Sequence, residues 1–167
     1  MKSLRLLLLV PLVIFASCAG PAPYRYQFVP GKTAVLRNGY AIPPAGAPER
    51  VLEAVAAGNR ITGSPYRYGG GHRSFDDTAY DCSGSASFVL HGAGLLDGPM
   101  PSTGFRRYGQ SGPGKWISVY ARRDHTFLVI AGLRFDTGFG PTRGCGPRWS
   151  DGPRPTTGAV VRHPPGL

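Results

Sequence analysis

The tetrapeptide Asp81-Cys82-Ser83-Gly84 contains the residue types that point most directly to chemistry. It precedes an apolar run over 86–96 with helical spacing, so the cysteine is expected in the first turn of a helix. There, unpaired backbone N–H groups and the helix dipole stabilise a thiolate, and the thiolate is the nucleophilic form of cysteine. The pattern therefore predicts a cysteine hydrolase in which Cys82 is the nucleophile.

A thiolate nucleophile needs an imidazole that holds and shuttles a proton, and the chain contains four histidines. His125 begins an apolar segment after a charged turn, and a strand packed on the helix would place it beside the helix N-terminus. His72 lies in a Gly-rich loop and His91 lies within the helix, so we expect a surface or core role for both. His163 lies near the C-terminus. Position alone therefore favours His125 as the base.

Three segments together resemble a known family: 66–70 (Tyr-Arg-Tyr-Gly-Gly), the tetrapeptide around Cys82, and a hairpin that begins at His125 and ends in Arg134-Phe135. They are similar to the NlpC-type peptidoglycan peptidases, which are papain-like cysteine enzymes. The resemblance covers residues 50–137 approximately. It implies cleavage of murein stem peptides, often between D-glutamate and a diamino acid, without a metal or any other cofactor.

The resemblance also implies roles for individual residues. Cys82 matches the nucleophile and His125 matches the base. Tyr66 matches a tyrosine that lines the site, although hydrophobic packing is an equally good explanation for it. Asp81 and Ser83 match residues that contact the free amine or backbone of the peptide, and a carboxylate beside a bound ammonium would form a charge-assisted hydrogen bond. Asp81 is also suited to cap the helix, which is compatible with that role.

The polar residue that orients the imidazole is less well defined by the sequence. In the family it lies on the strand that returns after the base, where a straight alignment gives Thr137. A one-residue bulge would instead turn the adjacent Asp136 inward, and a carboxylate orients an imidazolium better by its charge. His163 is a further alternative. We favour Asp136 as the third catalytic residue.

Residues 1–17 have the pattern of an export signal. Lys2 and Arg5 precede an apolar stretch that is too short to span a bilayer. The small residues before Cys18 resemble a bacterial lipoprotein cleavage box, so Cys18 is predicted to become the lipidated mature N-terminus. Ordinary cleavage after Ala19 is the alternative. In either case we expect the mature protein to work outside the cytoplasm in the cell envelope, and we favour a lipid anchor in the membrane.

The rest of the chain divides into a Pro-rich tether over 18–47, with a short strand or arm, and a single peptidase domain over 48–167. Helices are predicted over 48–57 and from Cys82 to Gly92 or Gly94. Strands are predicted over 116–120, 125–130, 133–137 and 159–162, with long loops over 98–114 and 138–158. Helices followed by an antiparallel β-meander define an α+β fold of the papain-like NlpC type.

The 167 residues carry a formal net charge of +10, yet no Lys/Arg run alternates with aromatic residues. For an exported protein we therefore expect anionic wall polymers or lipid head groups as partners rather than nucleic acid, and a monomer. A Cys82–Cys145 disulfide is the structural alternative to a reactive thiol in an oxidising compartment. A zinc site built from these cysteines and a histidine lacks the usual paired spacing.

These observations predict a secreted or membrane-anchored cell-wall hydrolase, a cysteine peptidase acting on peptidoglycan stem peptides or crosslinks. Two alternatives use the same fold. One is a catalytically inactive lipoprotein that binds the wall, and the other is a papain-like amidase or acyltransferase.

Overall fold

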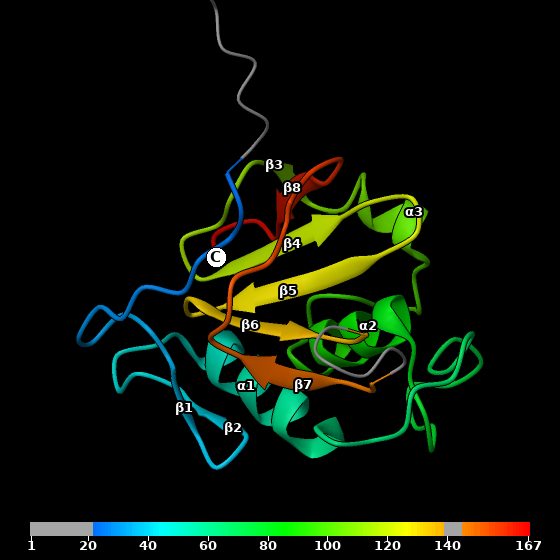
Figure 1. Cartoon of the computed structure of the whole chain (residues 1–167), viewed down its shortest axis with the longest axis horizontal. Helices are drawn as coiled ribbons and strands as arrows, with labels where there is room; N and C mark the ends of the chain where they lie inside the picture. The colour runs from blue at the N-terminus through cyan, green and yellow to red at the C-terminus, as the bar shows by residue number, and fades with distance from the viewer. Residues whose placement is uncertain (1–21, 139–144) are drawn as a thin grey trace, which may run out of the picture.

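The computed structural model describes residues 22–138 and 145–167. The predicted signal and Cys18 lie outside the described residues. The helices are α1 (Glu49–Ile61), α2 (Cys82–Gly92) and α3 (Ser102–Phe105). The strands are β1 (Val35–Arg37), β2 (Tyr40–Ile42), β3 (Gln110–Ser111), β4 (Ile117–Ala121), β5 (Thr126–Ile130), β6 (Leu133–Asp136), β7 (Arg148–Ser150) and β8 (Val160–His163) (Figure 1).

A six-stranded antiparallel sheet forms the centre of the molecule, with the order β3-β8-β4-β5-β6-β7. Strands β4 to β7 form a meander, and β8 returns to pair with β4. Helix α2 packs against β5 and β6, and α1 packs against α2 (Figure 1). The mixed α+β architecture expected from the sequence is therefore present.

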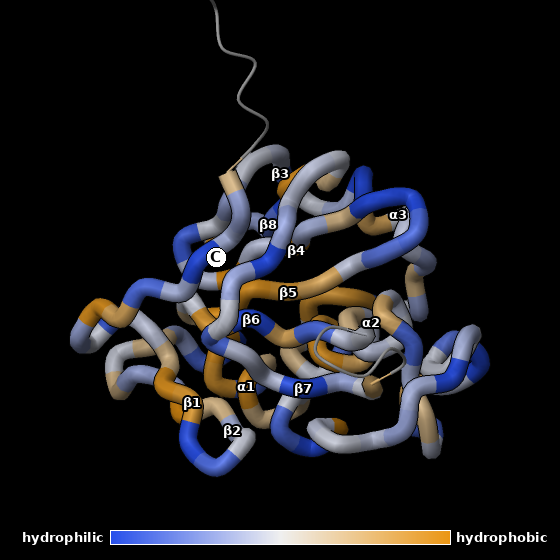
Figure 2. The backbone as a smooth tube through the Cα atoms, viewed as in Figure 1, coloured by the Kyte–Doolittle hydropathy of each residue, from blue (hydrophilic) through white to orange (hydrophobic). Residues whose placement is uncertain are grey.

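The core lies between α1, α2 and the sheet. Every residue of α2 over 82–90 is buried, so this part of the helix is enclosed by the protein, unlike an amphipathic surface helix. Strand β5 is buried throughout. Figure 2 shows hydrophobic residues along α1, α2 and β5, whereas β6 contains hydrophilic residues. On β6, Arg134 and Asp136 are buried polar residues and must be paired with other groups.

Helix α1 ends at Ile61, later than the predicted end at residue 57. Gly58 is not a stop signal: an added Cβ there would lie 2.5 Å from the Trp149 ring, so the glycine permits close packing of α1 on β7. The Asn59 side chain exchanges hydrogen bonds of 3.0 and 2.9 Å with the backbone of Ala41 on β2. Both residues therefore connect the helix to neighbouring strands.

Several segments predicted as loop or tether are ordered elements. The segment 138–158 contains β7, which pairs with β6 and places Trp149 opposite Phe135. The segment 98–114 contains α3 and β3. The described part of 18–47 includes the β1–β2 hairpin and is packed on the domain, since Ala34 and Ala41 are buried. No helix within 22–138 and 145–167 has the length and apolar composition needed to cross a bilayer.

The loop over 66–71 lies directly against the start of α2. The Gly70 carbonyl accepts a hydrogen bond from the Asp81 N–H at 3.2 Å. An added Cβ on Gly84 would lie 1.9 Å from that carbonyl oxygen, and one on Gly70 would lie 2.3 Å from the Ala79 carbonyl oxygen. The glycines of the two sequence motifs are therefore required because the backbones approach each other closely.

Replacing Gly84 by alanine is expected to lower the free energy of unfolding by about 1–3 kcal/mol, because the obstructing atom is backbone and cannot rotate away. Urea unfolding followed by circular dichroism measures the change. Gly98→Ala is the matched control, since an added Cβ there meets no atom within 4 Å. Equal unfolding midpoints for the two variants would contradict this explanation of the motif.

Candidate active site

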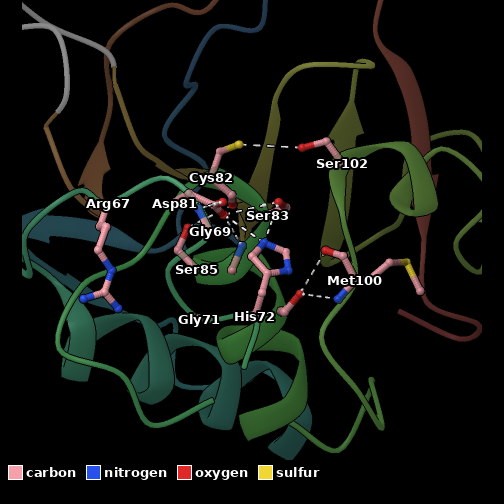
Figure 3. A network of polar contacts seen from close by, with 12 residues as sticks. Arg67, Gly69, Gly71, His72, Asp81, Cys82, Ser83, Ser85, Met100 and Ser102 are labelled. Carbon is pink, nitrogen blue, oxygen red and sulfur yellow. Dashed lines mark hydrogen bonds and ion pairs between the residues drawn. The ribbon is translucent and has the colours of Figure 1, made fainter. Parts of the chain in front are cut away.

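Cys82 is the first residue of α2, and the structure confirms its predicted place at a helix N-terminus. The Asp81 side chain caps this helix by accepting a hydrogen bond from the Gly84 N–H at 2.7 Å. The Cys82 Sγ lies 3.6 Å from the Ser102 Oγ, which Figure 3 shows facing the sulfur. The His125 side chain and the Thr126 backbone N–H also lie close enough to the sulfur to stabilise its charged form.

These contacts favour the thiolate. Burial raises the pKa of the Cys82 thiol, but the hydrogen bond from His125 and the charge of its ring act in the opposite direction. The hydrogen bonds from Ser102 and Thr126 add to this effect, so the pKa of Cys82 lies below its ordinary value. The arrangement thus has the electrostatic character of an activated nucleophile.

Ser102 is held over the cysteine by its own segment. The Ser87 hydroxyl on α2 accepts a hydrogen bond from the Met100 N–H at 3.0 Å and lies 3.3 Å from the Met100 carbonyl oxygen, to which it donates. Phe105, at the end of α3, is completely buried. Ser102 was not identified from the sequence, because α3 falls in a stretch whose Gly and Pro content predicts a loop.

The β5–β6 hairpin brings Asp136 to His125. The two strands pair in a constant register, with Leu128 opposite Phe135, and this register places Asp136 on the same face as His125. No bulge is needed, contrary to the expectation from the straight alignment. The His125 Nε2 lies 2.7 Å from the Asp136 Oδ1, and the ring also interacts with Cys82.

The other two candidates for the third residue do not approach the imidazole in this way. Thr137 donates its backbone N–H to the Asp136 Oδ1 at 2.8 Å, while its buried hydroxyl has no hydrogen-bond partner among the described residues. His163 contacts the Gly112 carbonyl oxygen at 3.0 Å and the Gln110 Oε1 at 3.2 Å. The structure therefore places Asp136, rather than Thr137 or His163, beside His125.

The His125 ring is held in its protonated form. Burial lowers the pKa of His125, but the hydrogen bonds to Asp136 and Cys82 and the charges of both groups raise it to about 9. A thiolate beside an imidazolium is the resting state that papain-like chemistry requires. The side chain of His125 is 14% exposed, so the ring is not completely enclosed by the protein.

Two arginines also contact Asp136. The buried Arg134 Nη1 lies 2.5 Å from Oδ2, and the Arg154 Nε lies 3.0 Å from the same oxygen. The Arg154 Nη2 also lies 2.8 Å from the His125 Nε2. Since Nε2 cannot donate to Asp136 and accept from Arg154 at once, the raised pKa of His125 favours donation to Asp136. Arg154 then acts mainly through its ion pair.

Arg154 is positioned by the N-terminal segment. Its backbone exchanges hydrogen bonds of 2.8 and 2.9 Å with Tyr24, forming an isolated antiparallel bridge. Its guanidinium lies over the Phe127 ring at 5.8 Å. Arg134 was detectable in the sequence as a charged residue two positions before Asp136, but nothing local indicates Arg154, because its place depends on a pairing between distant segments.

A cleft of about 420 Å³ opens beside Cys82. All three residues predicted to bind substrate, Tyr66, Asp81 and Ser83, line this cleft. Burial, followed by the charges of Cys82 and Asp81, raises the pKa of Tyr66, so its hydroxyl remains a hydrogen-bond donor. The Asp81 Oδ2 already accepts a hydrogen bond from the Gly69 N–H at 2.9 Å.

His72 also lines the cleft, although the sequence favoured a surface or core role for it. Its Nε2 lies 3.1 Å from both the Asp81 Oδ1 and the Ser83 Oγ (Figure 3). Asp77 anchors the loop that carries His72: it pairs with Arg67 at 2.6 Å and accepts the Gly71 N–H at 3.0 Å. The backbone and Arg67 hydrogen bonds lower the pKa of Asp77 to about 2.

The structural alternatives for Cys82 are not supported. Cys82 is a free thiol, so the predicted alternative of a disulfide with Cys145 is not formed. Among residues 22–138 and 145–167, no group of three or more His, Cys, Asp or Glu side chains is arranged to hold a metal ion. The zinc alternative therefore has no supporting cluster in that part of the chain.

Solved structures share this fold. The structure of Rv1477, described as a hypothetical invasion protein of Mycobacterium tuberculosis, matches 68% of this chain and 62% of its own, with 22% identity and a TM-score of 0.50. A mutant of the Resuscitation Promoting Factor Interacting protein RipA matches 78% of this chain and 71% of its own, with 20% identity and a TM-score of 0.50. This chain thus spans less than two thirds of the Rv1477 structure.

No family model and no curated protein matches the sequence. The two likenesses confirm the papain-like α+β fold expected from the sequence.

Replacing Asp136 by asparagine is expected to lower the pKa of His125 from its value of about 9, because the charge that stabilises the imidazolium is removed while burial remains. With less imidazolium beside it, the pKa of Cys82 rises. The rate at which iodoacetamide alkylates Cys82 is measured at several pH values by mass analysis of the peptide that contains Cys82. Relative to the wild-type rate, the rate of the variant should therefore fall most at pH 6. Thr137→Val is the control and should keep the wild-type profile. Identical profiles for Asp136→Asn and wild type would refute the assigned role.

Replacing Arg134 by methionine is expected to lower the free energy of unfolding by about 3 kcal/mol, because it removes one partner of a buried ion pair. The Ser150 hydroxyl also loses the hydrogen bond of 2.9 Å that it accepts from Arg134, and keeps the one from the Gly152 N–H. Urea unfolding at pH 7 measures the loss. The same change at Arg37, an exposed residue of β1, should have little effect. A loss at Arg134 no larger than at Arg37 would mean that the buried pair does not contribute to stability.

Proposed function

We propose that this chain is an exported cell-wall hydrolase that cleaves peptide bonds in peptidoglycan stem peptides or crosslinks. The observation that carries the proposal is the contact of Cys82, His125 and Asp136 beside an open cleft. The fold, which the RipA and Rv1477 structures share, agrees with the family that the sequence motifs resemble. Anchoring through a lipid on Cys18, a place in the cell envelope and a monomeric state belong to the proposal.

In the proposed reaction the Cys82 Sγ attacks the carbonyl carbon of the scissile bond. His125 donates its proton to the leaving amine as the carbon–nitrogen bond breaks, which leaves a thioester and a neutral imidazole. The imidazole then takes a proton from water, whose oxygen attacks the thioester and releases the acid and the thiolate. Asp136 holds the ring in position and stabilises its protonated form in both steps.

The start of α2 offers a site for the negative charge that develops on the carbonyl oxygen. Since the Asp81 side chain caps the helix through the Gly84 N–H, it does not consume the N–H of Cys82. That N–H, together with the Ser102 hydroxyl 3.6 Å from the sulfur, is suited to stabilise the oxyanion. The helix dipole acts in the same direction.

The residues at the other side of the cleft suit a peptide with a free amine. Tyr66, Asp81 and Ser83 are the proposed binding residues, and the structure adds His72 to this group. The Asp81 carboxylate supplies the negative charge for an ammonium group. Its existing hydrogen bonds fix its orientation before substrate binds.

The proposal predicts that Cys82→Ala abolishes turnover, by more than about 10³-fold, while leaving the fold intact. Purified sacculi incubated with the wild-type protein should release soluble fragments with new amine termini, detected by mass spectrometry. The Cys145→Ser variant is the control and should remain active. Undiminished release by Cys82→Ala would exclude the thiolate mechanism. A wild-type protein whose Cys82 is rapidly alkylated but releases no fragments would exclude peptidoglycan as the substrate.

A further inference from the structure

A second cavity, lined by arginines, adjoins the cleft. Its volume is about 570 Å³, and its lining residues are Thr103, Arg106, Arg107 and Arg123. Thr103 and Arg123 also line the cleft beside Cys82, so the two cavities meet at these residues. We call the residues of the second cavity the arginine pocket.

Both sides of the arginine pocket are connected to the proposed catalytic residues. Arg106 and Arg107 directly follow α3, the helix that begins with Ser102, and the Arg107 N–H donates to the Gly104 carbonyl oxygen at 2.9 Å. Arg123 lies in the β4–β5 turn, two residues before His125. A hydrogen bond of 2.8 Å from the Arg122 N–H to the His125 carbonyl oxygen closes that turn. A ligand in the pocket is therefore within reach of the reacting sulfur.

The charges in the arginine pocket are not balanced by the protein. No acidic residue lines it, and within residues 22–138 and 145–167 no ion pair joins Arg106, Arg107 or Arg123 to a carboxylate. Asp124 lines the neighbouring cleft but lies 3.5 Å from the Arg122 Nε, with which it is paired. Three cations around one cavity repel each other, and a bound anion would relieve this repulsion.

We propose that the arginine pocket binds a carboxylate of the peptide substrate. The inference rests on the proposed function, because the pocket opens into the cleft beside Cys82. Asp81 and His72 line the cleft from the loop before α2, whereas the arginines approach it from α3 and the β4–β5 turn. A peptide with a free amine and an acidic group is thereby bound in one direction, with its amine near Asp81 and its carboxylate near the arginines.

A peptide carboxylate suits the pocket better than a phosphate of a wall polymer does. Thr103 and Arg123 belong to both cavities, so the anion must belong to a molecule that also occupies the cleft. An acidic stem peptide meets this requirement. A long anionic polymer would need only an exposed basic surface, without a connection to the reacting groups.

The test compares two synthetic stem peptides that contain D-glutamate followed by a diamino acid. They are identical except that the carboxyl of the diamino acid is free in one and a carboxamide in the other. Binding is measured by calorimetry with the Cys82→Ala protein, which cannot turn over either peptide under the proposed mechanism. The carboxylate peptide is expected to bind about 10-fold more tightly, as one charge-assisted interaction provides.

The double substitution Arg107→Gln and Arg123→Gln, in the same Cys82→Ala background, should remove this preference and leave the affinity for the carboxamide peptide within about 2-fold. Arg37→Gln is the matched control, since Arg37 is an exposed arginine on β1. Equal affinity for both peptides, or a preference that survives the double substitution, overturns the proposal. Loss of binding to sacculi without a change in peptide affinity also overturns it, and identifies a polymer phosphate as the anion.

Different results would contradict the proposed carboxylate site in the arginine pocket and the proposed hydrolase activity. If the binding preference is found but the wild-type protein cleaves neither peptide, the subsite stands and the hydrolase proposal fails. If the wild-type protein cleaves both peptides and neither binding nor kcat/KM distinguishes them, the hydrolase proposal stands and the subsite fails.

Discussion

The carboxylate of Asp136 is the group on which the architecture of the site depends. It is 3% exposed, and a buried carboxylate is strongly destabilising unless it is paired. Three cationic side chains supply that pairing: His125 from the residue before β5, Arg134 from β6, and Arg154 from the segment after β7. The strands are therefore held in one register by charge as well as by their backbone hydrogen bonds, and the imidazole is fixed by the same interaction.

The charges around this carboxylate also explain the state of the cysteine. An imidazolium and two guanidinium groups face a single carboxylate, so the cluster without Cys82 has an excess of positive charge. A thiolate reduces that excess, which agrees with the direction in which His125 shifts the pKa of Cys82. The same excess favours negative charge on a substrate oxygen during acyl transfer. One electrostatic feature thus stabilises both the nucleophile and the charge that its reaction creates.

The sequence predicted those features that depend on neighbouring residues. The start of α2 at Cys82 follows from a capping aspartate and an apolar run. The sequence favoured Asp136 only through a bulge, whereas the hairpin with a two-residue turn brings Asp136 to His125 in a regular register. Ala131 and Gly132 both have positive φ in that turn, as a tight hairpin with twisted strands requires. Strand β7 and Arg154 were missed because pairings with other segments of the chain place them. His72 was missed for another reason: the contacts of Asp77 with Arg67 and Gly71 order a Gly-rich loop that has no regular element. Trp149 packs on Phe135 and α1, yet its Gly- and Pro-rich surroundings are typical of a loop.

From residue 22 onward, the N-terminal segment lies against the part of the domain that carries Arg154. The Ala22 carbonyl oxygen accepts a hydrogen bond from the Thr156 hydroxyl at 2.8 Å, and Tyr24 pairs with the backbone of Arg154. The segment predicted as a tether is therefore bound to the domain from residue 22 onward. Four residue steps separate Ala22 from Cys18, and a chain of that length spans at most about 14 Å. Under the proposal that Cys18 is lipidated, the domain stays next to the membrane surface, and a pull on the anchor acts on the segment that pairs with the backbone of Arg154.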